Sequence, residues 1–169
     1  QRTLFVKYVQ IKKLVEAFSK QIYPFPLKYK NGEYMLGNMM QDQLLISGVL
    51  EHALKTHPHT EIVSHTIEGE IHRYTIEDSS KRAKKLANAL KKLEIKEGDI
   101  LGTIALNGYR HYELYFGISG IGAILHTLNP RLFPEQVEYI VNHAEDKYIF
   151  VDLPFLPIVE NVFENLSNV

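Results

Sequence analysis

The 169-residue sequence contains no cysteine. This absence excludes disulfide bonds, thiol nucleophiles and cysteine-ligated zinc sites together, and it fits a reducing compartment. No apolar run approaches the roughly 20 residues that a membrane-spanning helix needs. The net charge of -1 and the pI near 6.8 give no general attraction to nucleic acid or anionic lipid. No basic and aromatic binding motif occurs either, so we expect no nucleic-acid partner.

Several catalytic motifs are also missing. The sequence has no glycine-rich phosphate loop of the Walker or Rossmann type, no Gly-x-Ser-x-Gly elbow and no His-Glu-x-x-His motif. The segment GISGIG at residues 117–122 follows a predicted helix and precedes a predicted strand, which reverses the order of the Rossmann fingerprint. The histidines of HPH at residues 57–59 have no further ligands nearby, so we interpret them as part of a polar loop. The residues alone therefore indicate no complete catalytic site and no metal site.

Residues 2–22 are predicted to form an amphipathic helix. Five basic residues and one acidic residue occur in this segment. Such a helix packs its apolar face against the rest of this chain or against a partner chain, or it lies on a membrane surface. The pattern leaves these alternatives open. The apolar positions alternate in steps of four and three, which places them on one face: Leu4, Tyr8, Ile11, Val15, Phe18 and Ile22.

Pro24, Pro26 and the pair Asn31-Gly32 are typical of a linker. We therefore expect residues 1–37 to be an N-terminal helix and linker, and residues 38–169 to form an α/β domain. A first helix is predicted over residues 44–55.

The segment EIVSHTIEGEIHRYT at residues 61–75 alternates around a Glu-Gly-Glu turn, which predicts a β-hairpin. Thr75 then begins a Thr-x-x-Asp variant of the capping box, so a helix is predicted over residues 76–93.

Three apolar segments after residue 98 are predicted to be buried strands: residues 100–106, 123–127 and 148–151. Helices are predicted between them over residues 109–120 and 135–144, and a last helix begins at Pro154 or Pro157. The order β-α-β-α-β-α predicts a three-layer α/β fold with a mostly parallel sheet and right-handed crossovers.

Polar residues follow each of these strands. In parallel sheets ligands bind beyond the carboxyl ends of the strands, so we expect a binding site at this edge. His126 is a candidate base or polar donor, and Asn129 and Arg131 are candidate ligands for a phosphate, carboxylate or carbonyl. In the alternative interpretation, Asn129-Pro130 only shapes a turn and Arg131 pairs with Glu135. The residues expected at the edge are Asn107, His126, Thr127, Asn129, Arg131 and Asp152.

Two stretches carry a family resemblance. MMQDQLLISGVLEHALKTHPHTEIVS at residues 39–64 and the stretch from TIEDSS to YIFVD at residues 75–152 resemble the N-terminal portion of fatty-acyl-CoA synthetases. These are medium- and long-chain acyl-CoA ligases of the adenylate-forming, AMP-binding superfamily. The most specific features are the Thr75 cap with the residues that follow it, Gly98-Asp99, GAILHTLNPRL at residues 122–132 and NHAEDK at residues 142–147.

The resemblance implies a two-step reaction. ATP and a fatty acid give an acyl-adenylate and pyrophosphate, and the CoA thiol then displaces AMP. It implies ATP, Mg²⁺ and CoA for the complete enzyme and none bound to this chain alone, because the family's phosphate loop and catalytic lysine would lie beyond Val169. No catalytic residue is carried over. The CoA- or substrate-side candidates are His126, Thr127, Asn129, Arg131 and Asn107.

Three further expectations follow. We expect the chain to be the N-terminal part of an enzyme that is cytoplasmic or peripheral to a membrane through residues 1–22, and to be inactive alone. We expect self-association through an exposed apolar sheet face or edge. The alternative is a non-catalytic interaction or dimerisation module, in which residues 1–22 pair chains or contact a membrane.

Overall fold

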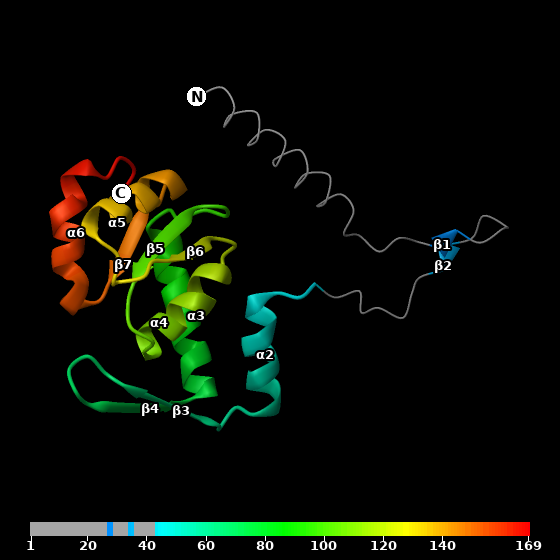
Figure 1. The fold of residues 1–169 in the computed structure, drawn as a ribbon. Coiled ribbons are helices and arrows are strands. Elements are labelled where there is room, and N and C mark those ends of the chain that lie inside the picture. Colours follow the sequence, from blue (N-terminus) through cyan, green and yellow to red (C-terminus); the bar gives the residue numbers. More distant parts are fainter. Residues whose placement is uncertain (1–26, 29–33, 36–42) are drawn as a thin grey trace. The chain divides into compact units, whose positions relative to one another are not determined.

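The computed structural model describes residues 27–28, 34–35 and 43–169 (Figure 1). The helix predicted over residues 2–22 lies outside these residues. Leu44–Val169 form one compact unit, and the preceding residues form a second unit. In that second unit β1 (Leu27–Lys28) and β2 (Tyr34–Met35) pair antiparallel. No helix in the described part of the chain combines the length and apolar character of a membrane span.

A three-stranded parallel sheet forms the centre of the compact unit. Its strands are β5 (Ile100–Ile104), β6 (Ile124–Thr127) and β7 (Tyr148–Val151), in the spatial order β6-β5-β7. In this register Gly102 of β5 lies between its partners on β6 and β7, and all three strands run in the same direction. The predicted parallel sheet is confirmed.

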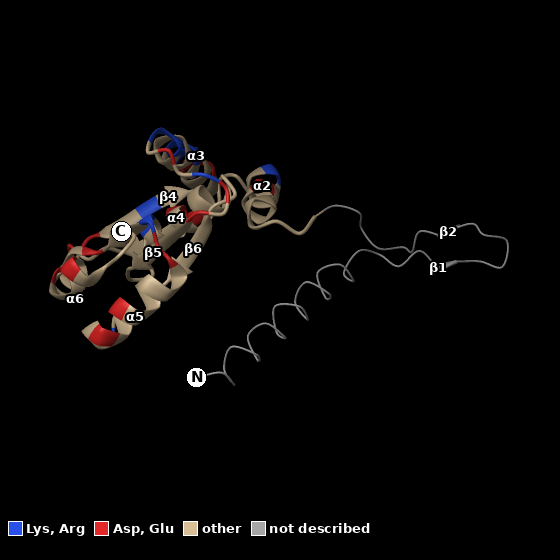
Figure 2. Cartoon of the chain, turned by 90° about the horizontal axis from the view of Figure 1, so that it is seen from above, with Lys and Arg blue, Asp and Glu red and all other residues tan. Residues whose placement is uncertain are grey.

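Helices cover both faces of this sheet (Figure 1). α3 (Ile76–Lys92) and α4 (Tyr109–Ser119) lie on one face, and α5 (Pro134–Ala144) and α6 (Leu156–Val162) lie on the other. Figure 2 shows that Lys and Arg dominate the outer surface of α3, whereas Asp and Glu occur on α5 and α6. Short 3-10 turns flank α6 at Leu153–Phe155 and Phe163–Asn165.

The central strand explains the continuous apolar run near residue 100. Leu101 packs into the cluster under α3 and α4, whereas Ile104 packs into the cluster under α5 and α6, and both side chains are fully buried. Successive side chains of a strand point to opposite faces, so a strand covered on both faces needs apolar residues at consecutive positions. Burying one such side chain contributes about 1.5–3 kcal/mol.

The hairpin and first helix complete the compact unit. α2 spans Ile46–Thr56, and the antiparallel strands β3 (Glu61–His65) and β4 (Ile71–Thr75) form the predicted hairpin. β4 runs directly into α3 through a complete capping box. The Thr75 hydroxyl accepts a hydrogen bond from the Asp78 N–H at 3.2 Å, and the Asp78 carboxylate accepts one from the Thr75 N–H at 3.2 Å. A further hydrogen bond from the Thr75 hydroxyl to the same carboxylate holds the pKa of Asp78 below its ordinary value.

We predict that Thr75→Ala lowers the free energy of unfolding by about 1 kcal/mol, because the first turn of α3 loses its cap. Urea unfolding followed by circular dichroism measures this change. Thr60→Ala is the matched control, since Thr60 is exposed and, among the described residues, only its backbone N–H and carbonyl form hydrogen bonds. Equal effects of the two substitutions would contradict the role of the cap.

Candidate functional site

The carboxyl ends of the three strands meet at one edge of the sheet, as the parallel order requires. At this edge Asp152, directly after β7, accepts a hydrogen bond from the Leu106 N–H at 2.8 Å. The bond joins the chain segments that follow β7 and β5. Asp152 was expected at this edge, and its carboxylate holds the backbone there.

His111 is a buried polar residue at the same edge that the sequence analysis did not select. It lies in the first turns of α4, is 7% exposed, and its Nε2 is 3.1 Å from the Thr103 hydroxyl of β5. Burial lowers the pKa of His111, and the negative charge of Asp152 partly opposes this effect. The neutral imidazole is therefore the favoured form in the folded protein.

Asn107 lies beside His111 in a small pocket of about 280 Å³. Ile62 and Ser64 of β3 form another part of its lining, together with Tyr112 and Tyr115 of α4. Asn107 itself is exposed. The hairpin, far from Asn107 in sequence, thus forms one side of the carboxyl edge.

His126 lies within β6, opposite Gly102, and not beyond the strand end. Its Nδ1 is 3.0 and 2.9 Å from the two carboxylate oxygens of Asp146, in the segment between α5 and β7. The Asp146 side chain is fully buried, whereas that of His126 is 25% exposed. Burial raises the pKa of Asp146, and the hydrogen bond from His126 opposes this rise. Asp146 was not among the sequence candidates.

The turn after β6 carries the other candidates. The side-chain oxygen of Asn129 accepts a hydrogen bond from the Arg131 N–H at 3.0 Å, so Asn129 does shape the turn. Among the described residues no ion pair joins Arg131 to Glu135. The side chains of Thr127, Asn129 and Arg131 are exposed. No hydrogen bond in the described part of the chain joins Asn107 to this turn.

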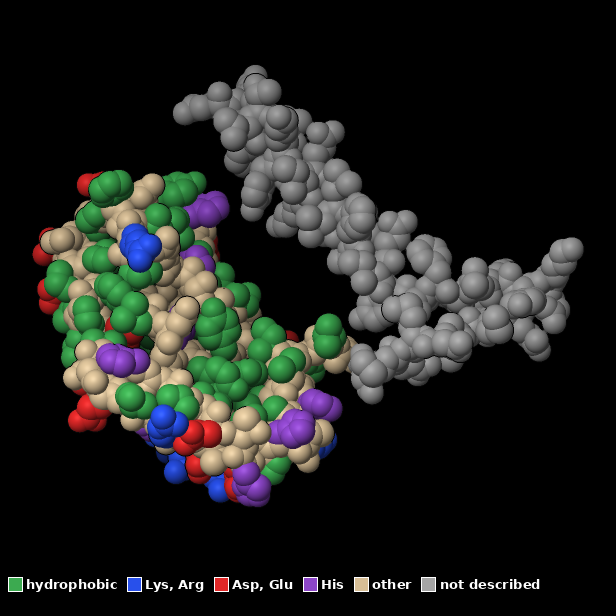
Figure 3. All heavy atoms as spheres, turned by 60° about the horizontal axis from the view of Figure 1, so that its bottom comes forward, with side chains coloured by type: hydrophobic (Ala, Val, Ile, Leu, Met, Phe, Trp, Pro, Cys, Tyr) green, Lys and Arg blue, Asp and Glu red, His purple; other side chains and the backbone are tan. Residues whose placement is uncertain are grey.

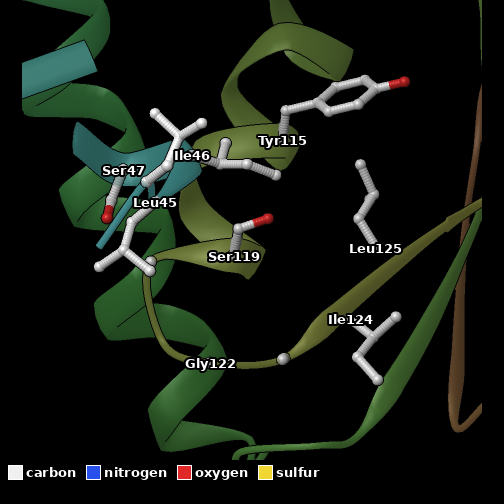
Figure 4. Close-up of a pocket in the computed structure, with 11 residues that line it drawn as sticks. Leu45, Ile46, Ser47, Tyr115, Ser119, Gly122, Ile124 and Leu125 are labelled. Atoms are coloured by element: carbon white, nitrogen blue, oxygen red, sulfur yellow. The ribbon is translucent and has the colours of Figure 1, made fainter. Parts of the chain in front are cut away.

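An apolar hollow of about 640 Å³ lies between α2, α4 and the outer edge of β6. In Figure 4, Leu45 and Ile46 come from the start of α2, Tyr115 and Ser119 from α4, and Ile124 and Leu125 from β6. Ile124 is 50% exposed and Leu45 is 53% exposed. Figure 3 shows hydrophobic side chains gathered on one face of the compact unit.

The sequence is similar to several curated acyl-CoA ligases. It is 45% identical over 135 residues to the medium-chain-fatty-acid–CoA ligase of Ectopseudomonas oleovorans and 44% identical over 135 residues to the 3-methylmercaptopropionyl-CoA ligase of Ruegeria lacuscaerulensis. It is 41% identical over 131 residues to the long-chain-fatty-acid–CoA ligase of Thermus thermophilus. These alignments cover 78–80% of the chain and 24–25% of each relative. The chain thus spans about a quarter of the length of these relatives.

Solved structures show the same fold. The anthranilate CoA ligase AuaEII, crystallised with anthranoyl-AMP, superposes with a TM-score of 0.65 at 28% identity, covering 73% of this chain and 23% of that one. The N-terminal domain of FACL13 from Mycobacterium tuberculosis superposes with a TM-score of 0.67 at 20% identity, covering 75% of this chain and 32% of that one. At 20% identity, the similarity to the FACL13 domain shows a shared fold and nothing more.

A parallel sheet covered on both faces, with polar strand ends at one edge, defines an α/β ligand-binding architecture. The AMP-binding enzyme family matches residues 50–168. The chain belongs to this family.

We predict that acidification destabilises the protein partly through His111. Because its folded-state pKa lies below the ordinary value of 6.5, its contribution to stability is complete above pH 6.5 and is lost as the pH falls toward the folded-state pKa. His111→Gln should therefore reduce the loss of unfolding free energy between about pH 7 and pH 5. The exposed His52→Gln variant is the control and should keep the wild-type pH dependence. If the unfolding free energies of wild type and His111→Gln change equally with pH, His111 does not contribute to the acid destabilisation.

Proposed function

We propose that the chain is part of an ATP-dependent fatty acid–CoA ligase, which forms an acyl-adenylate and then transfers the acyl group to CoA. The observation that carries this proposal is the match of residues 50–168 to the AMP-binding family, together with 41–45% identity to medium- and long-chain-fatty-acid–CoA ligases. The 3-methylmercaptopropionyl-CoA ligase is 44% identical, so relatives of similar identity are named for acids of different length.

The five candidates of the carboxyl edge are proposed as contacts on the CoA or substrate side. Four of them, Asn107, Thr127, Asn129 and Arg131, are exposed, which leaves their polar groups accessible to a ligand. The guanidinium of Arg131 suits a phosphate or carboxylate. His126 is different, because its Nδ1 is already used by Asp146 and its Nε2 is the group that remains.

The described residues do not fit a Mg²⁺ site of their own. In the described part of the chain, no group of three or more His, Asp and Glu side chains is arranged so that it could hold a metal ion. The sequence also has no glycine-rich phosphate loop. We therefore assign ATP and Mg²⁺ binding to polypeptide corresponding to the three quarters of the relatives that this chain does not match.

We predict that the purified chain releases no CoA-dependent AMP from ATP and octanoate or palmitate, whereas a chimera is active. In the chimera, this chain replaces the matched quarter of the Ectopseudomonas oleovorans ligase, to which it is 45% identical. The chimera should form acyl-CoA because the shared fold supplies the same framework. The unmodified ligase is the positive control.

Two outcomes would contradict this proposal. AMP release by the chain alone would overturn the assignment of ATP binding to other polypeptide. A chimera that folds, binds ATP and yet forms no acyl-CoA with any tested acid would overturn the function.

The apolar hollow favours a second proposal, that the isolated chain self-associates. β6 pairs only with β5 among the described strands, so its outer edge and the half-exposed Ile124 are available to another chain. Sedimentation velocity should show a mass that rises with concentration, and Ile124→Lys should reduce this rise. Ile71→Lys is the control, since Ile71 is 61% exposed on the hairpin. A monomer at every concentration would contradict the proposal.

A further inference from the structure

The fully buried carboxylate of Asp146 has one hydrogen-bonding partner among the described residues, the imidazole of His126. Both carboxylate oxygens lie within 3.0 Å of the same nitrogen, Nδ1. A buried carboxylate without donors costs several kcal/mol, so this contact is required to stabilise the charge. An ionised carboxylate can only accept hydrogen bonds, so Nδ1 carries the proton when Asp146 is ionised.

The backbone is arranged to bring Asp146 to this place. Glu145, the residue before it, ends α5 in the left-handed conformation with φ of 61°. A residue other than glycine pays roughly 1–2 kcal/mol for this conformation. The Asp146 N–H then donates to the Val141 carbonyl at 3.2 Å. The surrounding structure thus holds a conformation that the sequence does not favour locally.

Gly102 of the central strand provides the space for the carboxylate. A Cβ atom at this position would lie 3.0 Å from an Asp146 carboxylate oxygen and 3.2 Å from a methyl group of Leu128. Gly102 is also the residue that pairs with His126 in the sheet. The missing side chain on β5 therefore lets the two polar residues meet across the sheet surface.

We propose that Asp146 and His126 form a proton-accepting dyad, in which Asp146 is a positioning residue that holds the neutral imidazole with its proton on Nδ1. Nε2 then keeps a free lone pair, because the hydrogen bond at one ring nitrogen fixes the tautomer at the other. The His126 side chain is 25% exposed, and we expect a donor such as a thiol or hydroxyl to reach Nε2. The ligand class is thus a molecule that presents an acidic S–H or O–H group.

The use of this dyad in a reaction rests on the proposed function, but its existence does not. When a thiol attacks an acyl-adenylate, a sulfur–carbon bond forms, the bond between the acyl carbon and the AMP oxygen breaks, and AMP leaves with the electron pair. The thiol proton must go to an acceptor, and Nε2 of His126 can take it. The tautomer and the acylation of His126 can be measured in the isolated chain without ligase activity. These measurements therefore test the dyad independently of the proposed function.

Nuclear magnetic resonance of the ¹⁵N-histidine-labelled chain tests the tautomer directly. Near pH 8, long-range ¹H–¹⁵N correlations should show His126 protonated at Nδ1 and unprotonated at Nε2. Asp146→Asn should shift the population toward the Nε2–H form, because the amide no longer requires a donor at Nδ1. His126→Gln identifies the resonance by removing it.

Acylation by diethyl pyrocarbonate tests whether Nε2 is available. His126 should be modified in the wild-type chain and several-fold more slowly in Asp146→Asn, with sites and rates read by peptide mass spectrometry. Asp152→Asn is the matched control, because that carboxylate accepts a backbone N–H and does not contact His126. If Asp146 and His126 only stabilise the fold and Nε2 is blocked, His126 should stay unmodified while the exposed His52 reacts.

The proposal is overturned if wild-type His126 carries its proton on Nε2, or if Asp146→Asn changes neither the tautomer nor the acylation rate. If Asp146→Asn does not fold, the tautomer and the acylation of His126 in the wild-type chain test the proposal by themselves. Loss of acyl-CoA formation by the chimera with an intact Nδ1–H tautomer would count against the proposed function and leave the dyad standing.

Discussion

Parallel pairing of β5 with both of its neighbours is the constraint on which the rest of the structure depends. It buries β5 on both faces, so two separate apolar clusters form, one under each pair of helices. It also places the residues after each strand at one edge, where loops rather than helices cover the sheet. A site at this edge is therefore a consequence of topology, and the particular side chains decide what the site binds.

Polar residues of the sheet and of its carboxyl edge have two different functions in the structure. Asp152 and Asn129 hold backbone: one joins the ends of β7 and β5, and the other closes the turn after β6. Burial shifts the pKa of two other groups, His111 on α4 and Asp146 before β7, and Asp146 contacts the partly buried His126 of β6. Such groups are costly to keep in a protein interior, which makes them stronger candidates for chemistry than the exposed side chains beside them.

Much of the fold could be predicted from the sequence because its signals are local. The continuous apolar segment at Ile100–Ile104 indicates a strand covered on both faces, Pro134 marks the start of α5, and Thr75 with Asp78 marks the start of α3. The candidate site was predicted only in part. Asp146 lies in the charged triplet Glu-Asp-Lys, which in sequence resembles an exposed turn. Its burial depends on Gly102, a residue on another strand, and no local pattern shows that relation. His111 was missed for a similar reason, because its partner Thr103 is on the central strand.

The direction of the strands can be measured most directly by nuclear Overhauser contacts in the labelled chain. We expect contacts of Thr103 with Thr127 and with Phe150, and contacts of Leu101 with Leu125 and with Tyr148. These pairs advance in the same direction along all three strands. Contacts that join Leu101 to Thr127, or Leu101 to Val151, would show antiparallel pairing, and the polar strand ends would then lie at opposite edges of the sheet.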